Sequence, residues 1–78
     1  MRRKEAARLY DQNVDLVFAF AASLVGDRTV VEEATVQTFQ RANRAIHALG
    51  WPDGDVGVWL CGIARQVINE LTTTVGGQ

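Results

Sequence analysis

Apolar side chains recur at steps of three and four residues through most of this chain, and that period constrains its fold more than any other feature. In the first segment the repeat runs through Leu9, Tyr10, Val14, Val17, Phe18, Ala21 and Leu24. Such spacing places these side chains on one face of an α-helix. Gly26, just past the last periodic residue, is a typical helix terminator. The sequence shows no strand-like alternation of useful length, so the predicted fold class is all-α.

Two further helices are predicted from the same period. The second has two N-cap candidates, because Thr29 and Glu32 have the spacing of a capping box and Asp27 is an alternative cap. Its inner face is expected to comprise Val31, Ala34 or Thr35, Thr38, Phe39, Ala42, Ala45, Ile46 and Leu49. After the turn residues of "GWPDGD", Asp55 can cap a third helix. The inner face of that helix is expected to comprise Val56, Trp59, Leu60, Ile63, Ala64, Val67 and Leu71.

The length of 78 residues suits one small domain of three helices. Residues 1–6 are expected to form a basic N-terminal extension, residues 7–71 the helical domain, and residues 72–78 a flexible tail without good helix formers. The longest apolar run, residues 14–25, contains Asp15 and is too short to span a bilayer. The N-terminus lacks the apolar segment of a secretory signal. A lone Cys61 fits a reducing compartment, so a cytoplasmic location without membrane contact is expected.

The formal net charge of −1 is unevenly distributed. The first ten residues carry four basic side chains and one acidic side chain, whereas the rest of the chain carries four basic and eight acidic side chains. From Trp51 onward the only cation is Arg65. Because nucleic-acid-binding proteins usually present a basic face, any DNA binding by this part of the chain is expected to be weak.

The residue types that enzymes use are sparse in this sequence. His47 and Cys61 are the only residues of their kinds, too few for the usual ligands of a structural zinc ion. Phosphate-binding, dinucleotide and serine-nucleophile motifs are absent from the sequence. Glu32 and Glu33 are adjacent, so on a helix their side chains point about 100° apart and do not converge as an acid–base pair. Neither catalysis nor a cofactor or metal is expected.

A set of short motifs in a defined order is more informative. The motifs are "LYD" at Leu9 to Asp11, "VFAFA" at Val17 to Ala21, "GDR" at Gly26 to Arg28, "EEAT…TFQRA" from Glu32 to Ala42, "PDG" at Pro52 to Gly54 and "WLCGIAR" at Trp59 to Arg65. In this order and spacing, the stretch from Ala7 to Leu71 resembles region 2 of the extracytoplasmic-function sigma factors. These are bacterial subunits that direct RNA polymerase to promoters.

The resemblance implies two functional surfaces. The second helix would dock on the clamp helices of the polymerase β′ subunit, and the docking residues by position are Glu32, Glu33, Gln37, Gln40 and Arg41. The loop that follows and the third helix would capture flipped bases of the non-template −10 strand and so help to open the promoter. The DNA contacts by position are Arg44, His47, Trp51, Asp53, Arg65, Gln66 and Asn69. Unstacking a base costs a few kcal/mol, which aromatic stacking offsets by roughly 1–3 kcal/mol per base.

Several of these side chains have a second interpretation. Trp51 lies in a turn and could cover the core as a lid instead of contacting DNA. His47 could be an ordinary solvated residue near a helix end. Trp59 is in phase with the inner face of its helix and is expected in the core, with base contact as the alternative. Cys61 stands where the family often has an aromatic residue and is expected to act as a small hydrophobe.

Departures from the family's pattern bear on the DNA role. Val36 and Gln37 stand in place of the usual glutamine and glutamate, Asn43 in place of a tryptophan, and Val56 and Gly57 in place of an aromatic and a basic residue. The third helix ends in threonines instead of arginines, although Lys and Arg contacts to phosphate supply most non-specific affinity. A second hypothesis therefore keeps the fold without promoter binding. In it the chain is a protein-interaction module whose partner is polymerase, an anti-sigma factor or another protein.

Overall fold

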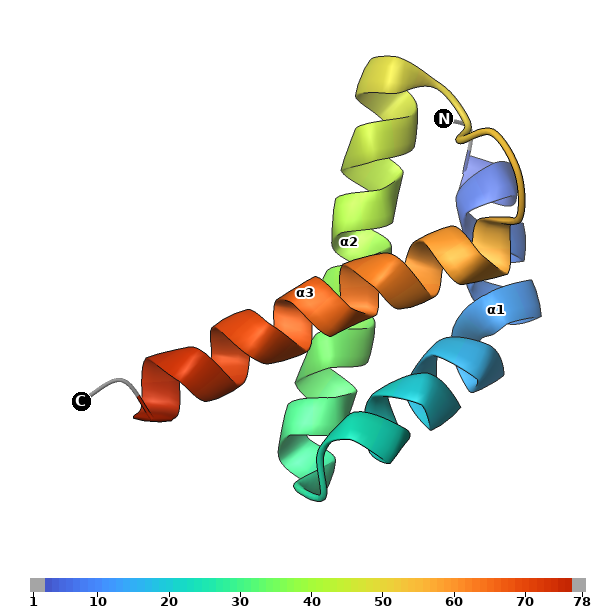
Figure 1. The fold of residues 1–78 in the computed structure, drawn as a ribbon. Helices are drawn as coiled ribbons and strands as arrows, with labels where there is room; N and C mark the ends of the chain where they lie inside the picture. Colours follow the sequence, from blue (N-terminus) through green and yellow to red (C-terminus); the bar gives the residue numbers. More distant parts are fainter. Residues whose placement is uncertain (1–2, 77–78) are drawn as a thin grey trace.

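Three long helices make up the domain in the computed structural model, which describes residues 3–76. They are α1 (Arg3–Leu24), α2 (Arg28–Leu49) and α3 (Val56–Gly76). α1 and α2 meet at a short turn, and α3 crosses over α2 (Figure 1). Each helix packs against both of the others. The predicted all-α fold of three helices is thus confirmed.

The start of α2 is fixed by Asp27. Its Oδ1 accepts hydrogen bonds from the backbone N–H groups of Thr29 at 2.9 Å and Val30 at 3.3 Å. The extended backbone of Asp27, with φ −85° and ψ 113°, is typical of an N-cap residue. The capping box predicted at Thr29 and Glu32 is wrong, because Thr29 lies inside the helix and Glu32 accepts from Arg28 Nε at 3.1 Å. The alternative cap at Asp27 is confirmed.

The loop between α2 and α3 is held at both ends. The N–H of Gly50 donates to the carbonyl of Ile46 at 2.8 Å and closes the last turn of α2. The backbone of Gly50, with φ 88° and ψ 177°, lies in a region that is essentially confined to glycine. At the other end, Asp55 Oδ1 accepts from the N–H of Val58 at 3.0 Å, so the predicted cap of α3 is confirmed.

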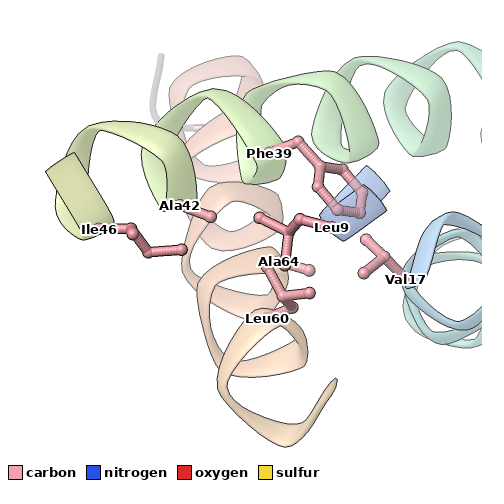
Figure 2. Packing of buried hydrophobic residues seen from close by; sticks show 7 residues of the cluster. All are labelled: Leu9, Val17, Phe39, Ala42, Ile46, Leu60 and Ala64. Atoms are coloured by element: carbon pink, nitrogen blue, oxygen red, sulfur yellow. The ribbon is translucent and has the colours of Figure 1, made fainter. Parts of the chain in front are cut away.

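The core consists of two buried clusters, and each draws side chains from all three helices. The larger cluster comprises Leu9, Val17, Phe39, Ala42, Ile46, Leu60 and Ala64 (Figure 2). The second comprises Ala21, Val31, Ala34, Val67 and Ile68. Thr35 and Thr38 are also buried, and their hydroxyls donate to the carbonyls one turn back, at 2.8 and 2.7 Å. These hydroxyls are therefore satisfied without leaving the apolar interior.

Three residues predicted on the inner faces lie at the surface. Tyr10 is 45% exposed, Leu24 44% and Leu49 87%. Tyr10 keeps an edge-on contact with Phe39, at 4.9 Å between ring centroids. Leu24 and Leu49 are each the last residue of a helix, where the chain turns away from the layer that would cover them.

Both ends of the helical region extend beyond the predicted limits. α1 begins at Arg3, inside the stretch expected as an extension, and α3 continues to Gly76, inside the stretch expected as a tail. The hydroxyl of Thr72 donates to the carbonyl of Ile68 at 2.8 Å, a bond that threonine can make within a helix. The low helix propensity of threonine, at most about 0.7 kcal/mol per residue, is too small to end a helix by itself. Residues 1, 2, 77 and 78 lie outside the described residues.

Candidate functional site

The side of α2 that faces away from the core carries a continuous strip of polar side chains. At about 100° per residue, the members of this strip fall within an arc of about 80°. They are Glu33, Gln37, Gln40, Arg44 and His47. All are exposed except Gln37, which is half-buried and donates from Nε2 to Glu33 Oε2 at 2.8 Å. Residues predicted to dock on polymerase and residues predicted to contact DNA therefore share one surface, called here the α2 strip.

Arg41 lies beside the α2 strip, on the side of α2 that faces α3. Its guanidinium forms a two-pronged ion pair with Glu70, in which Nη1 donates to Oε2 at 3.2 Å and Nη2 donates to Oε1. The hydrogen bond from Arg41 lowers the pKa of Glu70, and the same bond raises the pKa of Arg41. Arg41 thus links α2 to α3, a contact that the sequence pattern did not predict.

A pocket lies beside the loop, between the end of α2 and the start of α3. It has a volume of about 280 Å³ and is lined by Ala45, Leu49, Gly50, Trp51, Pro52, Asp53 and Trp59. Trp51 is 47% exposed, whereas Trp59 is half-buried and packs against the main core cluster. Both tryptophans of the chain therefore border this cavity, called here the loop pocket. Ala45 and Leu49 were expected only on the inner face of α2, and no sequence motif marked them as pocket residues.

The predicted DNA contacts on α3 are all exposed but point in different directions. By helical phase, Gln66 points about 20° away from the direction of Trp59. Asn69 lies about 80° from Trp59 and Arg65 about 120°. The loop pocket therefore brings together Trp51 and Asp53, whereas Gln66 lies about 10 Å further along α3 and Arg65 faces another direction.

Two further features of the described residues bear on reactivity, the thiol of Cys61 and the arrangement of potential metal ligands. Cys61 is half-buried, and burial together with the nearby charge of Asp55 raises the pKa of its thiol. A raised pKa keeps the thiol protonated, which agrees with the expected role as a small hydrophobe. Within residues 3–76, no three His, Cys, Asp or Glu side chains lie close enough to hold a metal ion. In the same residues, no helix has the length and apolar character needed to cross a bilayer.

Comparison with known proteins agrees with this architecture. Residues 9–73, which reach from α1 into α3, match the family model of sigma-70 region 2. The chain belongs to the sigma-70 region 2 family.

Within this class, the chain is similar to the ECF RNA polymerase sigma factor BldN of Streptomyces coelicolor, with 39% identity over 63 residues. The matched segment covers 81% of this chain and 24% of the relative, so it represents about a quarter of that protein. No solved structure matches the chain significantly. The resemblance to extracytoplasmic-function sigma factors is thereby confirmed.

Proposed function

We propose that this domain docks on the core of RNA polymerase and helps to open promoters during transcription initiation. The α2 strip binds the clamp helices of the β′ subunit, and the loop pocket receives a flipped base of the non-template −10 strand. One observation carries the proposal: both tryptophans of the chain border the loop pocket, which lies at the C-terminal end of the helix that carries the α2 strip. A DNA strand in the pocket would therefore lie at the end of the helix that polymerase is proposed to bind.

The composition of the α2 strip supports docking on another protein. Glu33 and Gln40 are exposed and take no part in either core cluster. At the margin of the strip, Val36 is 51% exposed and offers an apolar contact where the family usually has a polar residue. An interface of this kind excludes water around a few charged side chains, and removing one partner of a buried charge pair costs about 2–5 kcal/mol of binding free energy.

The loop pocket has the size and lining to hold one base. Its volume of about 280 Å³ lies just below the range of about 300–1,000 Å³ that holds whole small-molecule ligands. The rings of Trp51 and Trp59 offer stacking surfaces worth roughly 1–3 kcal/mol per base, enough to offset the unstacking cost. The carboxylate of Asp53 can accept a hydrogen bond from the amino group of a base.

Titration of the domain with an isolated β′ clamp-helix fragment tests the docking step. The Glu33→Lys variant should bind at least about tenfold more weakly, because the loss of one buried charge contact costs about 1.4 kcal/mol or more of binding free energy. Asp15→Lys is the matched control, since Asp15 is exposed on α1 and the change in net charge is the same. Both variants should keep the melting temperature of the parent domain.

Two results would overturn the docking proposal. One is an equal loss of affinity in Glu33→Lys and Asp15→Lys, which would assign the effect to net charge. The other is an absence of binding at high micromolar concentration while the parent domain is folded. Arg41 is less suitable for this test, because its reversal would also break the ion pair with Glu70 that links α2 to α3.

An exposed apolar patch favours a second candidate, a protein-interaction module that does not bind promoter DNA. Leu16 is 49% exposed and Val58 71% exposed. The side chain of Leu16 packs over Gly57, the residue before Val58, since a Cβ atom on Gly57 would lie 2.8 Å from Leu16 Cδ2. Polymerase, an anti-sigma factor or another protein could cover this patch, since exposed apolar surface often marks an interface.

Tryptophan fluorescence separates the two candidates. Addition of a −10 non-template single strand should change the emission of Trp51 if a base enters the loop pocket. An unchanged signal at saturating DNA, with binding to the clamp-helix fragment retained, would favour the interaction module.

A further inference from the structure

A second cavity also borders Trp51 and lies between the loop and the first turns of α1. It has a volume of about 230 Å³ and is lined by Glu5, Arg8, Leu9, Gln12, Asn13, Trp51 and Val56. Trp51 is therefore a wall shared by two cavities, and this one is called here the α1 pocket. Figure 1 shows the N-terminal turns of α1 beside the loop that joins α2 to α3. Residues more than forty positions apart in the sequence meet at this place.

The N-terminal turns of α1 carry a concentration of positive charge. Arg3, Lys4 and Arg8 are all exposed, and the acidic residue among them is Glu5. Arg8 lines the α1 pocket, and Lys4 lies one turn away at a phase difference of about 40°. α3 offers only Arg65, which points about 120° away from Trp59. The fold thus places Arg8, a cation of α1, in the same cavity as Trp51.

We propose that the α1 pocket binds a second nucleotide of the DNA strand whose flipped base enters the loop pocket, with Arg8 contacting its phosphate. This inference rests on the proposed capture of a base by the loop. Trp51 lines both cavities, and two cavities that adjoin one side chain suit neighbouring nucleotides of one strand. Arg8 supplies the phosphate contact that the threonines at the end of α3 cannot make.

The lining of the α1 pocket fits a nucleotide. Leu9, Trp51 and Val56 provide apolar surface for a base, and a volume of about 230 Å³ is too small for most whole ligands. The amides of Gln12 and Asn13 can pair with polar atoms of a base edge. Asn13 is oriented by the hydrogen bond from its Nδ2 to the carbonyl of Leu9 at 2.9 Å. The carboxylate of Glu5 repels a phosphate, so the phosphate belongs at the Arg8 side.

The test measures how the domain binds a fluorescein-labelled −10 non-template single strand at several salt concentrations. Arg8→Gln should weaken binding and lower the slope of log K against log salt by about 0.7, the value for one phosphate contact with a single strand. Arg28→Gln is the matched control, because it removes the same charge from an exposed residue. Arg28 lies at the start of α2, at the opposite end of that helix from the loop. Its slope should equal that of the parent domain.

Leu49→Glu separates this inference from the proposed function, because it places a carboxylate at the loop pocket and leaves the α1 pocket intact. If Leu49→Glu abolishes binding while Arg8→Gln behaves like Arg28→Gln, base capture stands and the α1 pocket is refuted. If both variants weaken binding and only Arg8→Gln lowers the salt slope, both proposals are supported. If the folded parent domain does not bind the strand at all, both are refuted.

Discussion

Replacement of Gly50 by alanine tests whether the loop that carries Trp51 depends on a backbone conformation reserved for glycine. Gly50 has φ 88° and ψ 177°, and its N–H closes the last turn of α2 through the carbonyl of Ile46. An added Cβ atom would meet nothing within 4 Å. The effect of Gly50→Ala therefore arises from the backbone alone and not from a steric clash.

The expected loss can be worked out from the strain. Holding a residue with a side chain in this region costs about 1–3 kcal/mol. At roughly 0.05–0.15 kcal/mol per residue, the free energy of unfolding of a 78-residue domain is about 4–12 kcal/mol. Because about 1 kcal/mol shifts the melting temperature of such a domain by about 4–8 °C, Gly50→Ala should lower it by roughly 4–24 °C.

Thermal unfolding followed by far-UV circular dichroism measures this shift, and two other glycines provide controls. Gly26 and Gly62 also have nothing within 4 Å of an added Cβ atom, and neither has a positive φ. Gly26→Ala should melt close to the parent domain. Gly62→Ala should melt higher, because alanine inside a helix is favoured over glycine by about 0.8–1.0 kcal/mol. If Gly50→Ala melts like Gly26→Ala, the loop can adopt another backbone conformation at little cost in free energy, and the argument that it requires glycine at position 50 fails.

Two further predictions concern contacts that hold the helices in place. Asp27→Ala should lower the free energy of unfolding by about 1 kcal/mol and Thr29→Ala by much less, because only Asp27 accepts the capping bonds; equal losses in urea unfolding would contradict the cap. The ion pair with Arg41 lowers the pKa of Glu70 in the folded domain. The pair therefore stabilises the folded domain above the ordinary pKa near 4.5, and this stabilisation is lost as the pH falls through the lower pKa of the folded state. Glu70→Gln should therefore flatten the acid side of the plot of melting temperature against pH, whereas an unchanged acid slope would show that the pair contributes nothing in solution.

Local sequence patterns predicted the helices and most of the core, because the direction of a side chain on a helix depends only on the 100° step between residues. The same reasoning failed where the burial of a side chain depends on which other elements pack over it. Leu24 and Leu49 continue the apolar period, but each ends its helix and is left uncovered. The sequence offers two possible N-caps close together, Asp27 and Thr29. Which of them caps the helix depends on the backbone conformation, and only the structure shows that Asp27 has the extended backbone of an N-cap.

The candidate site could be predicted only in part. The motifs identified the α2 strip and the loop, since both belong to continuous stretches of sequence. The ion pair of Arg41 with Glu70 depends on how α3 crosses α2, and the position of Trp51 and Arg8 at one cavity depends on where the loop runs. No periodic pattern in the sequence contains this information. The basic N-terminus was visible in the composition, but its position beside the loop was not.

Position in space also changes the meaning of the charge distribution. From the sequence, the scarcity of cations after Trp51 weakens the case for DNA binding, because α3 is the helix that follows the loop. A phosphate responds to the charges around it whatever their order in the chain, over a screening length of about 10 Å at 0.1 M salt. Since Arg8 and the loop line the same cavity, a strand held at Trp51 would experience the cations of α1. If the salt slope of Arg8→Gln falls as expected, the missing arginines of α3 mark a change in the route of the strand and not a loss of affinity for it.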